Sequence, residues 1–503
     1  MRLYRFTSCA VGLLLLALHA PEVRAQQQDP NQAQSQPSQQ SQQQSAPPIP
    51  AYRSPFASAA DNGDVDNPNL DPQRIIPDDH ALAGAENLGL GMPALTHSYW
   101  QPHFDLLSTI DSNPTVAPGQ TGWSAETSIL AGVDLRRTSG NSDLTVTYMG
   151  GGMLSNTGNA SNGIVQGLDF KDKISFRRAS VSFIDQLSYI PGSSFGFAGL
   201  GTIQLPGTGT AGLGSSFTSG QSILTGLGQD ITNSFVTEVD AYLTPRSSIS
   251  MVGGYSLLHY FDGGLLDYGN TNAQLGYNYQ LNRTDTIALS YQFSAFRYGN
   301  FDQSINSNTL FVSYGHRVTG RLAFQVAAGP EFAFLHLPIS AGVGTGTSST
   351  SNTGTNSVTD VSWALSTSLR YQLHRANLGL TYTRDISGGS GVLAGSLLNS
   401  VSGSFGGPLS RTTTGNLNFG FSHNSGTSLA STSSPVSQSF AYWFGGANLS
   451  HPWGRTLNLS LTYQLQYQNS NSSFCIATTC GTNVLRNSIS LGLGWRSRPI
   501  AFQ

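Results

Sequence analysis

The strongest constraint on the fold is a period-two alternation of apolar and polar residues that recurs in segment after segment from residue 98 onward. In the segment from Leu457 to Tyr467, Leu and Tyr occupy every second position, and Asn, Ser, Thr and Gln occupy all the positions between them. Successive side chains of a β-strand point to opposite faces, whereas a helix would mix the two sets. The sequence therefore predicts strands with one apolar and one polar face.

The polar face of these segments consists mostly of uncharged hydroxyl and amide side chains. Only 10% of the 503 residues are charged, whereas charged residues make up about a quarter of a typical soluble domain. A membrane barrel explains this shortage, because its outer wall faces lipid and its polar face is enclosed. The segments are also close to the about 9 to 11 residues with which a tilted strand crosses a membrane. A soluble β-sandwich is the competing interpretation.

The alternating segments predict an all-β fold, a transmembrane antiparallel up-and-down β-barrel over residues 98–498. We expect about 18 strands, with 16 as the next choice, joined alternately by short periplasmic turns and long external loops. The last long loops are expected near residues 386–395, 424–437 and 470–483. The longest, 191–232, is expected either to narrow the lumen or to lie over its mouth.

The first 97 residues differ in character from the rest. Arg2 and Arg5 precede an apolar run over residues 11–18, and together with the residues up to Ala25 they predict a secretory signal peptide, 1–25. Residues 26–50 are almost entirely Gln, Ser, Pro, Asn and Ala and are predicted to be disordered. Residues 51–97, rich in Pro, Asp, Asn and Gly, are predicted to be a periplasmic linker.

Two cysteines remain after Cys9 leaves with the signal peptide. Cys475 and Cys480 lie in a polar segment and form a candidate disulfide, because a secreted protein folds in an oxidising compartment. A metal or redox pair is the alternative, but no His or acidic residue lies close enough in sequence to complete a site. We therefore expect no metal and no cofactor.

The alternation also predicts which charged side chains face the lumen. They are Glu126, Asp134, Asp169, Lys171, Lys173, Arg178, Glu238, Asp240, Glu331 and Arg370. Acids and bases that face each other across a pore can create a transverse field that selects solutes, whereas pairing along the wall would be structural. The histidines are scattered over different segments without ligand spacing, so no catalytic residue and no enzyme activity is expected.

Three short segments resemble outer-membrane β-barrel proteins of the porin-like superfamily, particularly barrels encoded near exopolysaccharide biosynthesis genes. They are residues 111–114, 185–191 and 491–499. Together with the expected barrel size, which leaves an aqueous lumen, the resemblance implies a channel for passive diffusion of small hydrophilic solutes or saccharides. The alternative is a non-conducting accessory or structural barrel for exopolysaccharide export, or a surface receptor.

The resemblance also implies a location and partners. The protein is expected in the outer membrane of a Gram-negative bacterium, with its N-terminal tail and short turns in the periplasm. Its expected partners are outer-membrane lipid, lipopolysaccharide and the barrel-insertion machinery, and a homo-oligomer is left open. The chain departs from the usual aromatic ending of such barrels, because Gln503 follows Phe502. A formal net charge of -3 argues against nucleic acid as a partner.

Overall fold

The computed structural model describes most of the chain from residue 98 onward. The described ranges are 98–113, 122–156, 162–193, 228–261, 267–299, 303–319, 321–338, 355–373, 375–389, 394–426, 439–470 and 483–502. The predicted signal peptide, tail and linker, most of the connection 191–232, and both Cys475 and Cys480 lie outside these residues. Within the described ranges, no helix is long and apolar enough to span a membrane.

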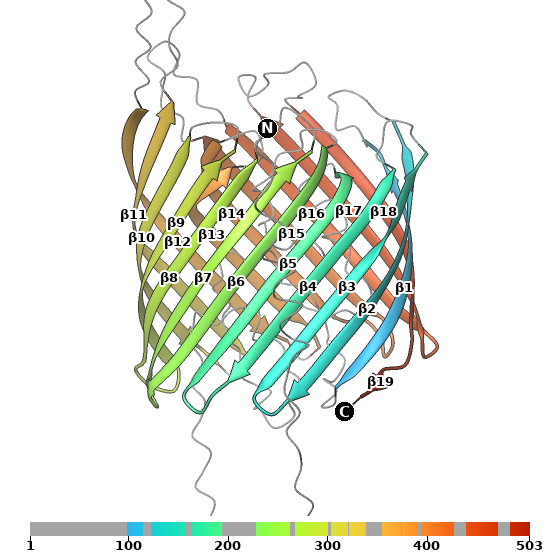
Figure 1. Ribbon diagram of the computed structural model, residues 1–503, viewed down its shortest axis with the longest axis horizontal. Helices are drawn as coiled ribbons and strands as arrows, with labels where there is room; N and C mark the ends of the chain where they lie inside the picture. The colour runs from blue at the N-terminus through green and yellow to red at the C-terminus, as the bar shows by residue number, and fades with distance from the viewer. Residues whose placement is uncertain are drawn as a thin grey trace, which may run out of the picture. The chain divides into compact units, whose positions relative to one another are not determined.

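The described residues form one antiparallel sheet whose strands follow one another in chain order (Figure 1). Each strand from β1 to β17 pairs with the next along the chain, and β1 pairs back with β18, so the sheet closes into a barrel of 18 long strands. The prediction of an up-and-down β-barrel with 18 strands is confirmed.

The first nine strands are β1 (Tyr99–Asp111), β2 (Ser124–Ser139), β3 (Ser142–Ser155), β4 (Gly163–Ser175), β5 (Ala179–Ser193), β6 (Gly228–Thr244), β7 (Ser247–Tyr260), β8 (Tyr268–Gln280) and β9 (Asp285–Tyr298). The next nine are β10 (Ser304–Arg317), β11 (Leu322–Pro338), β12 (Thr355–Gln372), β13 (Asn377–Gly389), β14 (Ala394–Pro408), β15 (Thr414–Gly426), β16 (Ser439–Trp453), β17 (Leu457–Ser470) and β18 (Asn483–Arg496). A short β19 (Ile500–Ala501) ends the chain.

The barrel closes along β1 and β18. Their register runs from His103 opposite Arg496 to Asp111 opposite Ser488. The short β19 extends the same edge, with Trp100 opposite Ile500. Because both ends of the barrel sequence meet here, every long strand pairs with a neighbour on each side over at least part of its length.

The two faces of the wall differ as the alternation predicts. On β17, Tyr463 and Leu465 are exposed on one face, while Gln466 is buried on the other and Gln464 is half-buried beside it. The convex face of a closed barrel spreads its side chains apart and the concave face crowds them. The exposed apolar face is therefore the outer wall, and the polar face lines the lumen.

The connections after even-numbered strands are short. They span from two residues at 140–141 to five at 409–413. Gly140 and Gly454 lie in two of these turns with φ angles of 51° and 77°, a backbone conformation that glycine adopts without a steric penalty. Most of the other connections are longer. The expected long loop over residues 386–395 is an exception and is corrected, because β13 and β14 extend as paired strands to Gly389 and from Ala394.

A pair of neighbouring substitutions tests the assignment of the faces. Leu465→Arg places a charge on the outer wall and should lower the free energy of unfolding from lipid vesicles by about 2 to 4 kcal/mol. Gln464→Arg places the same charge on the lumenal face and should cost much less. Denaturant titration followed by tryptophan fluorescence measures both. Equal losses would contradict the assignment.

Candidate functional site

The lumenal face carries its charged side chains mainly on one side of the barrel. Strand register places Asp134 on β2 opposite Thr147 on β3, which lies opposite Asp169 on β4. Four residues closer to the short turn between β2 and β3, Asp143 on β3 lies opposite Lys173 on β4. Acids and bases therefore stand side by side along the wall from β2 to β6.

The strand register places most of the residues predicted to face the lumen on the lumenal face of the barrel. They are Glu126, Asp134, Asp169, Lys171, Lys173, Glu238, Asp240, Glu331 and Arg370. Arg178 does not share the face, because β5 begins at Ala179 and Arg178 lies exposed in the turn before it. The backbone carbonyl of Arg178 accepts a hydrogen bond from the backbone N–H of Tyr242.

A buried polar cluster sits at the closure of the barrel. The imidazole of His103 on β1 is fully buried, with Nδ1 3.4 Å from Oδ2 of Asp134 on β2. Arg496 on β18 donates from Nη1 to the same oxygen at 3.3 Å. The carboxylate of Asp105 lies 4.0 Å from His103 Nε2. The cluster thus joins β18, β1 and β2 across the seam. Of its residues, only Asp134 was predicted from the sequence to face the lumen.

A second ion pair also crosses the seam. Arg486 on β18 donates to the carboxylate of Asp111 at the far end of β1. Both side chains are largely buried. Removing one partner of a buried pair leaves an uncompensated charge, which is strongly destabilising. These contacts therefore belong to the structure of the wall as much as to the electrostatics of the lumen.

Two other stretches of the lumenal face are neutral. Among the described residues of β7 to β9 and β14 to β17, the lumen-facing positions hold no charged side chain and are dominated by Ser, Thr, Asn and Gln. Asn448, for example, donates to Thr462 Oγ1 at 2.7 Å across β16 and β17. The rings of Tyr442 and Phe444 stack nearby, with their centroids 5.9 Å apart. The lumen therefore has its densest charges from β18 through β1 to β6, a smaller charged stretch with Glu331 and Arg370 on β11 and β12, and neutral walls between the two.

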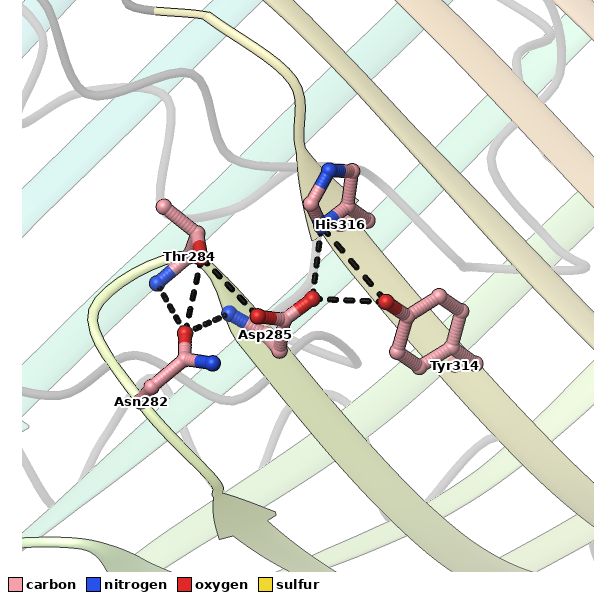
Figure 2. A network of polar contacts seen from close by, with 5 residues as sticks. All are labelled: Asn282, Thr284, Asp285, Tyr314 and His316. Carbon is pink, nitrogen blue, oxygen red and sulfur yellow. Dashed lines mark hydrogen bonds and ion pairs between the residues drawn. The ribbon is translucent and has the colours of Figure 1, made fainter.

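A different polar network lies on the outer wall beside the turn between β8 and β9 (Figure 2). Oδ1 of Asp285 accepts a hydrogen bond from the Tyr314 hydroxyl at 2.6 Å and lies 2.6 Å from Nδ1 of His316. The ring of Phe324 on β11 packs against the rings of Tyr314 and His316. The pairing of Asp285 with His316 was not visible in the sequence, because the two residues lie on different strands.

The network has part of a hydrolase arrangement but not its reactive group. A His–Asp pair activates a hydroxyl or thiol that hydrogen-bonds to the imidazole. Thr284 Oγ1 donates instead to Oδ1 of Asn282 at 2.7 Å. The Tyr314 hydroxyl lies 3.5 Å from His316 Nδ1 but donates its proton to Asp285 at 2.6 Å. The network therefore fixes the turn and holds aromatic rings at the rim of the apolar wall, where barrels carry an aromatic girdle. In the described part of the chain, no group of three His, Cys, Asp or Glu side chains could hold a metal ion.

Comparison with known proteins gives only a broad likeness. No family model matches the chain, and no curated protein matches its sequence. Among solved structures, the outer membrane protein opdK from Pseudomonas aeruginosa aligns with 79% of this chain and 99% of its own, at 10% identity and a TM-score of 0.38. OpdQ of the same organism aligns with 81% of this chain and 100% of its own, at 10% identity and a TM-score of 0.39. OprD, also of that organism, aligns with 80% of this chain and 96% of its own, at 11% identity and a TM-score of 0.36. These values are too low to assign a family or an activity.

The His103 cluster generates a stability prediction at Gly132. Gly132 lies opposite His103, and a Cβ at this position would clash with the imidazole ring and with the Tyr148 carbonyl. Gly132→Ala should therefore lower the free energy of unfolding by about 1 to 3 kcal/mol, the usual effect of overpacking. The matched control is Gly253→Ala on β7, where a Cβ would meet nothing within 4 Å. Urea titration in detergent micelles should show a loss in the first variant only. A similar loss in both would contradict the packing argument.

Proposed function

We propose that the chain is an outer-membrane channel for the passive diffusion of small hydrophilic solutes. The observation that carries the proposal is the sorting of side chains over a closed wall: exposed apolar residues outside, and hydroxyl and amide residues inside. Lipid accepts such an outer wall, because every backbone group within a closed barrel can pair in the ladder. A barrel of about 16 to 18 strands is wide enough to enclose an aqueous path.

The lining favours uncharged polyhydroxyl solutes such as saccharides. The neutral sides of the lumen offer amide and hydroxyl groups, which both donate and accept hydrogen bonds. The charged side, from β2 to β6, carries both signs next to each other, as with Asp143 and Lys173. Neighbouring opposite charges give a local transverse field and little net attraction for either sign of ion. Orientation of a dipolar solute fits this arrangement better than capture of an ion.

The location and partners follow from the channel proposal. The apolar outer wall would contact outer-membrane lipid and lipopolysaccharide, and the barrel-insertion machinery would place it there. The short turns would face the periplasm and the longer connections the exterior. Association into a homo-oligomer belongs to the same proposal and would use part of the outer wall.

The alternative is a non-conducting barrel. The resemblance to barrels encoded near exopolysaccharide genes favours an accessory or structural role in exopolysaccharide export, or a surface receptor. The two functions differ in whether solutes cross the lumen. The same measurement therefore separates them.

Single-channel recording of the folded mature protein in a planar bilayer tests the channel. We expect stepwise openings with weak ion selectivity. Lys171→Gln/Lys173→Gln removes two lumenal cations from β4 and should shift the reversal potential in a salt gradient toward cations. Arg455→Gln, in the turn before β17, is the matched control and should shift it little. Silence from correctly folded protein would overturn the channel and leave the non-conducting barrel.

A further inference from the structure

The hydrogen-bonded ladder of the wall is interrupted between β12 and β13. These strands pair from Gln372 opposite Asn377 to Leu365 opposite Arg384, and the pairing ends there. Both strands nevertheless continue. Residues 355–364 of β12 pair on their other side with β11, and residues 385–389 of β13 pair on theirs with β14. The described strands thus share a wall below this point and separate above it.

Above the break, β13 lies on the lumenal side of β11 and β12, while it stays paired with β14. The backbone N–H of Ile386 donates to Oε1 of Glu331 at 3.2 Å, although Glu331 belongs to β11 and β12 lies between the two strands in the sheet order. Glu331 is almost fully buried and projects from the lumenal face. A lumenal side chain of β11 can reach the backbone of β13 only if β13 has moved inward past β12.

The packing of Ile386 gives an independent sign of the same displacement. Ile386 is in phase with Leu378 and Leu380, which belong to the outer wall, so in a regular barrel it would face lipid. It packs instead in a buried cluster with the lumenal side chains Leu335 and Phe296. The outer face of this part of β13 therefore lies against the inner face of the wall.

Glu331 holds this arrangement together. Its Oε1 also accepts from Ser307 on β10 at 2.7 Å, and its Oε2 accepts from Ser362 on β12 at 3.2 Å. The carboxylate is thus fixed by hydroxyls of the neighbouring strands on both sides, and it accepts a further hydrogen bond from the N–H of Ile386. Hydrogen bonds to a charged acceptor are stronger than those between neutral groups.

The part of β12 beside the break carries exposed side chains on its outer face. Val361 and Trp363 beside it are exposed, and the guanidinium of Arg384 lies 4.3 Å from the centroid of the Trp363 ring at the lower end of the break. Arg384 also donates to Oδ1 of Asn399 at 2.8 Å. Unpaired backbone groups are costly in lipid, so the edge of β12 above the break attracts any strand that can complete its ladder.

We propose that residues 385–389 of β13 form a gating segment with two positions, and that Glu331 is the positioning residue for the lumenal one. In the lumenal position, seen here, the segment fills space inside the barrel, and residues 355–364 of β12 pair with no described strand on the β13 side. In the edge position it pairs with β12, widens the lumen and completes the wall. Apolar packing of Ile386 and its bond to Glu331 favour the first position, and new ladder bonds favour the second.

Disulfide trapping measures the two positions directly. The register that ends with Leu365 opposite Arg384 would, if continued, bring Trp363 opposite Ile386, so Trp363→Cys/Ile386→Cys reports the edge position. Leu335→Cys/Ile386→Cys reports the lumenal position, because these side chains share one cluster. Both pairs are placed in a Cys9→Ser/Cys475→Ser/Cys480→Ser background of the full chain folded in vesicles, so that no native thiol remains. A disulfide forms where the Cα atoms come within about 4.4 to 6.8 Å.

We expect the lumenal pair to oxidise readily and the edge pair slowly. Glu331→Ala should speed the edge pair by about tenfold or more, the factor that corresponds to the loss of a hydrogen bond to a charged acceptor. Glu331→Gln keeps an acceptor oxygen and should restore most of the lumenal preference. Glu126→Ala removes a lumenal carboxylate on β2, away from the segment, and should leave both rates unchanged.

Two results would overturn the proposal. One is an edge pair that oxidises at the same rate with and without Glu331, and the other is an edge pair that never oxidises even in Glu331→Ala. Trapping is read on a gel and does not depend on conductance, so it stays valid if the barrel is silent. If the barrel conducts, the edge disulfide should raise its conductance and the lumenal disulfide should lower it.

Discussion

The structure depends on the pairing of β1 with β18. An open sheet would expose a row of backbone N–H and C=O groups at each edge, and lipid offers no hydrogen-bonding partner for them. Closing the sheet removes both edges at once. The seam joins residues almost 400 positions apart in the chain, such as Thr109 and Ser490, whose hydroxyl groups lie 2.8 Å apart. All other assignments of inside and outside follow from this closure.

Closure also explains where the buried charges gather. The His103 cluster and the pair of Asp111 with Arg486 both span the seam. Opposite charges on β1 and β18 find their partners only in the closed barrel, since register errors by one residue would turn one partner of each pair to the outer face. We infer that these contacts specify the closing register, in addition to any effect they have on the field in the lumen.

The sequence alone predicts the local part of this architecture well. Period-two alternation determines which residues share a face, so strand number and the lumenal placement of residues such as Glu126 and Glu331 could be predicted without coordinates. Arg178 was misplaced because alternation does not mark the first residue of a strand. The contacts of His103 with Asp134 and of His316 with Asp285 could not be predicted, because they depend on which strands become neighbours and on their register.

The upper end of β13 shows most clearly what alternation leaves open. Its sequence continues the strand pattern, and the strand itself continues to Gly389. Alternation predicts the two faces of a strand. It does not predict whether a strand end that no longer pairs with its neighbour lies in the wall or inside the barrel. Here the N–H of Ile386 donates to a buried carboxylate on β11, and Ile386 makes no ladder pair with the described residues of β12. In the proposed gate, a single lumenal side chain holds inside the barrel a strand end that local sequence signals assign to the wall, and so connects the polarity of the lumen to the shape of the barrel.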